Sequence, residues 1–223
     1  MTDLALTHDD FVSNPAARVP VILCLDVSSS MSGPPIDELQ QGLMQFIREV
    51  LADELAASAV ELSVVTFGER VQQDIPFGTL NESMTLALRA SGCTPMGEGV
   101  SLSLRLLEER KSTYQRMGID YYQPWLVIMT DGAPTDSIQE AAARCRELAA
   151  SRKLAVFPIG IGPGANLQTL AEFSPNRPPL RLQGLQFSKF FQWLSASMSR
   201  VSASTPGTTV PLDVAAITGW AQL

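Results

Sequence analysis

The stretch VPVILCLDVSSSMSG, residues 19–33, decides the fold of this chain. Its first part, residues 19–25, is a continuous apolar run of the kind typical of a parallel β-strand that is buried on both faces. The run ends at Asp26, and a loop rich in serine follows. A second stretch, WLVIMTD at residues 125–131, repeats this pattern of a buried strand that ends in an aspartate. The two stretches predict a parallel sheet with acidic side chains at one edge.

Strand-like runs alternate with runs of helical periodicity along most of the chain. The predicted strands are residues 21–26, 60–67, 71–77, 125–131, 154–161 and 180–182, and the predicted helices centre on residues 36–51, 100–107, 136–151, 166–173 and 187–198. Such alternation predicts a Rossmann-like three-layer α/β/α sandwich around a mostly parallel six-stranded sheet. The polar run 71–77 is expected to form its one antiparallel edge strand.

Length and composition indicate one sizeable domain with short tails. Of the 223 residues, 45% are hydrophobic, so the chain can bury a large core. We interpret residues 1–18 as an N-terminal arm, residues 19–201 as the domain, and residues 202–223 as a linker and C-terminal tail. The aromatic residues in 187–191 are expected in the core. Trp220 in the tail has two open alternatives, packing on the domain or anchoring a partner.

Charge, hydropathy and cysteine content exclude several classes of protein. The net charge is −7 and the 16 basic residues are scattered, which argues against nucleic-acid binding. No apolar run is long enough for a signal peptide or a membrane span. The three cysteines lack the spacing of a disulfide framework or a zinc site. We therefore expect a cytoplasmic protein.

Five oxygen-bearing side chains are expected to meet at the carboxyl ends of the strands, where ligands bind in open parallel sheets. Asp26, Ser28 and Ser30 alternate along one loop, Thr94 lies in a loop between glycine and proline, and Asp131 ends the second strand. Two carboxylates and three hydroxyls are hard ligands that suit Mg²⁺ or Mn²⁺ before Ca²⁺. Neutral hydroxyls leave such an ion under-neutralised, so it should attract an Asp or Glu from a partner protein.

The pattern Asp-x-Ser-x-Ser, a loop threonine and a later Thr-Asp-Gly resembles that of the von Willebrand factor A (VWA) domain and its metal-ion-dependent adhesion site (MIDAS). The resemblance extends over the whole predicted domain. It implies that Asp26, Ser28 and Ser30 ligate the metal directly or through water. It also implies that Thr94 is the ligand whose loop moves on partner binding, and that Asp131 acts largely through water. The implied function is binding of a partner protein, not catalysis.

Two segments resemble a narrower group within that family. The opening at residues 19–33 and the CTPMG segment at residues 93–97 are similar to the bacterial TerY-like branch, which is associated with tellurite resistance and chemical stress. Members of that branch are linked to protein kinase and PP2C-type phosphatase partners. The resemblance implies a metal-dependent adaptor in a stress-response system of this type. Three dispersed cysteines argue against the additional cysteine-rich module that some relatives carry.

The sequence fits nucleotide-binding and hydrolytic functions less well than metal-dependent binding. The glycine-containing segment 92–98 has Glu98 where a phosphate loop needs lysine, and the only histidine, His8, lies in the arm, away from any serine nucleophile. A Mg²⁺-dependent phosphatase-like enzyme stays open as an alternative, although Ser28 replaces the second aspartate of the haloacid dehalogenase pattern. The other alternative is a metal-independent scaffold that keeps the fold but binds no metal through it. Separately, Asp26, Ser28 and Ser30 could simply form the cap of a helix that follows the strand.

Overall fold

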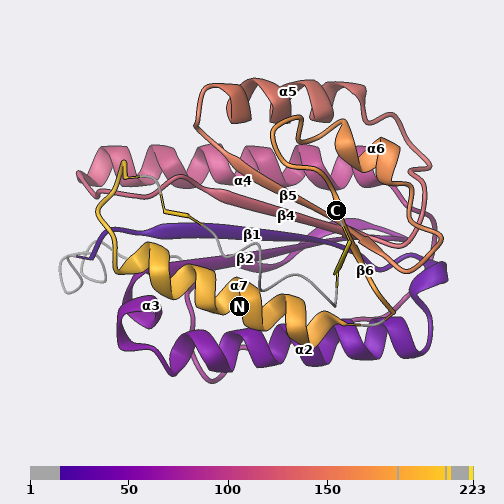
Figure 1. Cartoon of the computed structure of the whole chain (residues 1–223), viewed down its shortest axis with the longest axis horizontal. Helices are drawn as coiled ribbons and strands as arrows, with labels where there is room; N and C mark the ends of the chain where they lie inside the picture. The colour runs from indigo at the N-terminus through magenta and orange to yellow at the C-terminus, as the bar shows by residue number, and fades with distance from the viewer. Residues whose placement is uncertain (1–15, 185, 209, 212–220, 223) are drawn as a thin grey trace.

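The computed structural model describes residues 16–184, 186–208, 210–211 and 221–222. The strands are β1 (Val19–Asp26), β2 (Val60–Phe67), β3 (Val71–Thr79), β4 (Trp125–Thr130), β5 (Ala155–Ile161), β6 (Leu180–Leu182) and β7 (Ala221–Gln222). A short 3-10 helix η1 (Ser29–Met31) is followed by α2 (Pro34–Leu51), α3 (Glu54–Ala59), α4 (Met96–Met117), α5 (Gln139–Ala150), α6 (Leu167–Ala171) and α7 (Phe187–Ser202). Helices cover both faces of one sheet (Figure 1).

The sheet confirms the predicted Rossmann-like architecture. Its strand order is β3-β2-β1-β4-β5-β6-β7. β1, β2, β4, β5 and β6 run parallel, and β3 pairs antiparallel with β2 at one edge, as its polar composition predicted. The tail adds a seventh strand that was not predicted, since β7 pairs antiparallel with β6. A strand of two residues is too short to produce a periodic pattern in the sequence.

The central strands are buried on both faces because alternate side chains enter two separate cores. In β1, Val21, Leu23 and Leu25 join the core under α2 and α7. Ile22 and Cys24 join the core under α4 and α5 on the other face. Figure 1 shows these two helical layers on opposite sides of the sheet. Double burial explains why the strand reads as an unbroken apolar run.

Helix α2 begins at Pro34, a residue that suits the first helical turn, and the acidic Asp37 lies in the same turn. Its apolar stripe packs against α7, whose Phe187, Phe190 and Phe191 are fully buried, so the predicted aromatic core is confirmed. The ring centroids of Phe46 and Phe191 lie 5.8 Å apart across this contact. The α2–α7 pair therefore forms the helical layer that covers one face of the sheet.

Two helix predictions differ from the structure. Helix α3 was not predicted, because its six residues are too few to show a periodic stripe. Helix α5 begins at Gln139 and not at Asp136, because the Asp136 side chain accepts a hydrogen bond from the first turn of α4. His8 and Trp220 lie outside the described residues. Among the residues that are described, no helix has both the length and the apolar character needed to cross a bilayer.

Candidate metal site

β1 and β4 end side by side, which brings the two predicted aspartates to one edge of the sheet. Leu25 pairs with Met129, so Asp26 and Thr130 come next on neighbouring strands and Asp131 follows. Asp26 is fully buried. Its Oδ2 accepts a hydrogen bond of 2.5 Å from the Thr130 hydroxyl. The end of β4 thus fixes the carboxylate at the end of β1.

The serine loop after β1 connects the buried aspartate to the exposed one. The backbone N–H of Ser28 donates to Asp26 Oδ1 at 2.7 Å. The Oγ atoms of Ser28 and Ser30 lie 3.0 Å apart, and Ser30 Oγ donates to Asp131 Oδ1 at 2.7 Å. Ser28 is buried, whereas Ser30 is exposed and Asp131 partly so. Four of the five predicted ligands therefore form one connected cluster that opens toward solvent.

Thr94, the fifth predicted ligand, lies at the same edge and is held by the loop that follows β4. Its backbone N–H donates to Thr135 Oγ1 at 3.1 Å, and the Thr135 N–H donates to the Thr94 carbonyl at 2.9 Å. The Thr94 hydroxyl would lie 3.9 Å from a Cβ built on Gly132. Two residues before Thr94, the Gly92 carbonyl accepts a hydrogen bond of 3.1 Å from the Ser29 N–H. This bond connects the threonine loop to the serine loop.

The cluster contains two carboxylates, and no basic side chain of the described residues neutralises them. Burial raises the pKa of the Asp26 carboxyl above its ordinary value, hydrogen bonds from Ser28 and Thr130 lower it, and the nearby Asp131 raises it further. Within the described part of the chain, neither aspartate has an ion-pair partner. A divalent cation would offset both the desolvation of Asp26 and its repulsion from Asp131.

A family model for the von Willebrand factor type A domain matches residues 21–182 of the chain, which is well over half of its length. The chain belongs to this family. Mouse (Mus musculus) matrilin-4 is 24% identical to this VWA chain over 169 residues, which are 72% of the chain and 25% of matrilin-4. The chain therefore spans about a quarter of the length of that relative.

Solved structures share the fold of this VWA domain. The von Willebrand factor type A protein from Catenulispora acidiphila aligns with a TM-score of 0.65 and 16% identity over 83% of this chain and 43% of that one. Proximal thread matrix protein 1 from the mussel byssus, solved with a zinc-occupied MIDAS motif, aligns with a TM-score of 0.55 and 20% identity. That alignment covers 82% of this chain and 48% of the mussel protein.

The donor set at this edge of the VWA domain fits a hard divalent cation. Across the described residues, no group of three or more His, Cys, Asp or Glu side chains is placed to hold a metal. A cation here would rely on two carboxylates assisted by hydroxyls, which are oxygen ligands of the kind that Mg²⁺ and Mn²⁺ prefer. Ser30 and Asp131 lie on the outer side, so an ion beside them would remain within reach of a partner.

Three residues that support the cluster were not assigned to it from the sequence. Thr130 was read as part of an apolar strand, although its position beside Asp26 in a parallel register could have revealed it. Thr135 positions Thr94 and carries no local motif. Asp136 was expected in the first turn of its own helix. Instead it accepts from the N–H groups of Gly97 and Glu98 at 3.0 and 2.8 Å and caps α4.

Proposed function

We propose that this VWA domain is a metal-dependent protein-binding module and not an enzyme. Its divalent cation, Mg²⁺ or Mn²⁺, is held by Asp26, Ser28, Ser30, Thr94 and Asp131. When bound, the ion supplies an open coordination position for an Asp or Glu side chain of the partner. The chain's own part is to bury one carboxylate, present the other at the surface, and hold the hydroxyls between them.

The hydrogen bond from Ser30 to Asp131 is the observation that carries this proposal. It joins two loops 101 residues apart in the sequence, at 2.7 Å. The carboxylate of Asp131 and the two serine hydroxyls therefore occupy one small space. The zinc-occupied motif of the mussel protein, which has the same fold, supports a divalent cation at this place. The preference for Mg²⁺ or Mn²⁺ rests on the absence of His and Cys from the predicted ligand set.

The wider setting is also part of the proposal. The resemblance of residues 19–33 and 93–97 to the TerY-like branch supports a cytoplasmic adaptor of a bacterial stress-response or tellurite-resistance system. The partner of such an adaptor would be a protein kinase or a PP2C-type phosphatase. We assign the module to residues 19–201, which include the matched residues 21–182 and all of α7 except its last residue.

Direct metal binding tests the site. Isothermal titration with Mg²⁺, Mn²⁺, Ca²⁺ and Zn²⁺ should give one site for Mg²⁺ or Mn²⁺ in the wild type. Asp26→Ala and Ser30→Ala should abolish or strongly weaken it, whereas Asp37→Ala, an exposed acid on α2, should leave it unchanged. At a cation concentration of one hundred times the Kd, binding should stabilise the fold by about 2.7 kcal/mol. Wild-type affinity in a folded Asp26→Ala variant would refute the ligand assignment.

Partner capture then separates the adaptor from its two alternatives. A pull-down from the native cell compares Mg²⁺ with chelator, for the wild type and Asp26→Ala in parallel. Capture only by the wild type with metal is expected, and a captured kinase or phosphatase would favour the TerY-like setting. Equal capture in chelator would favour a metal-independent scaffold. Metal-dependent turnover of p-nitrophenyl phosphate, lost in Asp26→Ala, would favour a phosphatase-like enzyme.

A further inference from the structure

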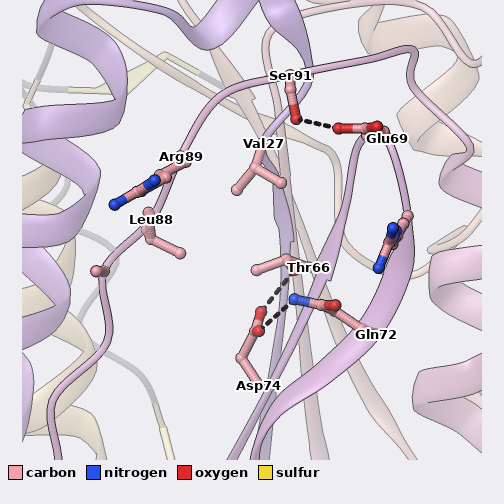
Figure 2. Close-up of a pocket in the computed structure, with 10 residues that line it drawn as sticks. Val27, Thr66, Glu69, Gln72, Asp74, Leu88, Arg89 and Ser91 are labelled. Atoms are coloured by element: carbon pink, nitrogen blue, oxygen red, sulfur yellow. Dashed lines mark hydrogen bonds between the residues drawn. The ribbon is translucent and has the colours of Figure 1, made fainter.

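A polar pocket lies beside the candidate metal site, on the side of the sheet edge formed by β2 and β3. Its volume is about 240 Å³. It is lined by the ends of those strands, by Val27 after β1, and by the extended segment 87–91 (Figure 2). A water molecule occupies about 30 Å³ in the liquid, and drug-sized ligands need about 300–1,000 Å³. The pocket is therefore large enough for one long side chain and too small for most free ligands.

The backbone of the metal loops forms one wall of this pocket. The Ser91 N–H donates to the Val27 carbonyl at 2.8 Å, and the Glu69 N–H donates to the Ser91 carbonyl at 2.9 Å. Gly92, with a φ of 76°, passes so close that an added Cβ would lie 2.4 Å from Glu69 Cα. Val27 lies between Asp26 and Ser28 in the chain. A ligand in the pocket would thus lie next to the metal loops.

Two carboxylates face this pocket and are bonded only to neutral groups. Asp74 accepts from the Thr66 hydroxyl and from the Gln72 amide, both at 2.6 Å (Figure 2). Glu69 accepts from the Ser91 hydroxyl at 3.3 Å. Neither carboxylate forms an ion pair with any described residue. Asp74 is partly buried and its hydrogen-bond donors are neutral, so a cation placed here would stabilise its charge.

The pocket also has two arginines in its lining, Arg70 and Arg89, but both are exposed. Figure 2 shows Arg89 extending away from Thr66 and Glu69. An exposed charge is well hydrated and gains little from an added partner, so the two arginines and the exposed Glu69 belong to the rim. An anion that entered the pocket would meet the carboxylate of Asp74. The interior therefore favours a cation.

We propose that this pocket binds the cationic side chain of a lysine or arginine from a partner protein. The apolar stem of that side chain would lie along Val27 and Leu88, and its charged head would reach the carboxylate of Asp74. Taken with the proposed function, on which this last step rests, a partner segment that docks here carries a basic residue near the acidic residue that reaches the metal.

The pocket is tested with a single side chain as the probe. Backbone amide NMR shifts are recorded in EDTA while N-acetyl-arginine amide is added, and again with N-acetyl-citrulline amide, its neutral isostere. The arginine probe should shift residues 66–74 and 87–91 with a Kd of about 1 mM, and the citrulline probe should bind at least about tenfold more weakly. Because chelator is present, the result is independent of the metal proposal.

Matched variants show whether Asp74 makes the contact. Asp74→Asn should weaken binding of the arginine probe about tenfold or more, whereas Glu82→Gln, which changes an exposed acid outside the pocket, should not. Overlaid spectra in the absence of probe show whether each variant remains folded. Equal binding of the two probes, undiminished binding in Asp74→Asn, shifts elsewhere on the domain, or tighter binding of N-acetyl-glutamate amide would each overturn the proposal.

Discussion

At the scale of single residues, the buried carboxylate of Asp26 is held by a backbone N–H on one oxygen and by the Thr130 hydroxyl on the other. A charged group that is removed from water needs such donors, because an unsatisfied buried charge costs several kcal/mol. Thr130 therefore has a role that differs from that of its strand neighbours, which fill the core. Its hydroxyl holds the Asp26 carboxylate in the orientation that the cluster shows.

Replacing Thr130 by valine keeps the shape of the side chain and removes only the hydroxyl. We expect Thr130→Val to lower the free energy of unfolding in EDTA by about 1.5–3 kcal/mol, the usual contribution of a hydrogen bond to a charged group. Urea unfolding measures this loss. Thr85→Val, at an exposed position, should change stability by less than about 0.5 kcal/mol. If the two variants were equally stable, Asp26 would not depend on this hydroxyl.

At the scale of elements, the start of α4 is fixed by a side chain from a distant loop. Both oxygens of Asp136 accept N–H groups in the first turn, and Thr94 comes two residues before the helix begins at Met96. A Cβ on Gly97 would lie 2.2 Å from the Ser137 carbonyl, so the helix and the loop approach as closely as glycine allows. This contact determines where the Thr94 loop lies relative to the end of β4.

Asp136→Ala should therefore affect both the helix and the metal. Loss of a capping carboxylate is expected to lower the free energy of unfolding by about 0.5–2 kcal/mol. We also expect weaker Mn²⁺ binding by isothermal titration, because the Thr94 loop loses its anchor. Asp136→Asn, which keeps one acceptor oxygen, should give a smaller loss of each. Asp120→Ala, at an exposed position, is the control, and a variant of Asp136 that matched it in both measurements would contradict this role.

The same elements show what the sequence can and cannot predict. The apolar runs in β1 and β4 predicted buried parallel strands, because burial on both faces leaves little room for polar residues. Asp26 and Asp131 could be placed at one edge because parallel strands end together. The role of Asp136 could not be predicted, since its partners are 38 and 39 residues away and the choice depends on tertiary packing.

At the scale of the whole molecule, buried charge occurs at both ends of the sheet. The carboxyl ends of β1 and β4 carry the candidate metal cluster. At the amino ends, Glu61 of β2 is fully buried and lies 3.3 Å from Arg18 Nε and 2.6 Å from Arg110 Nε. The Tyr114 hydroxyl donates a further hydrogen bond to Glu61. This second cluster joins the residue before β1, the start of β2 and the C-terminal half of α4, and none of its members was predicted to have a functional role.

The two ends should therefore respond differently to the loss of a charge. Glu61→Gln removes the carboxylate that two buried or partly buried guanidinium groups share, and breaking a buried ion pair in this way costs about 3–5 kcal/mol. We expect a loss of that size in urea unfolding, together with unchanged Mn²⁺ affinity at temperatures where the variant remains folded. Asp26→Ala should show the reverse, with Mn²⁺ binding lost and most of the free energy of unfolding retained. A folded Glu61→Gln variant with weakened metal binding would show that the two ends are coupled through the sheet. The route would be β1, which pairs with β2 along its whole length and ends at Asp26.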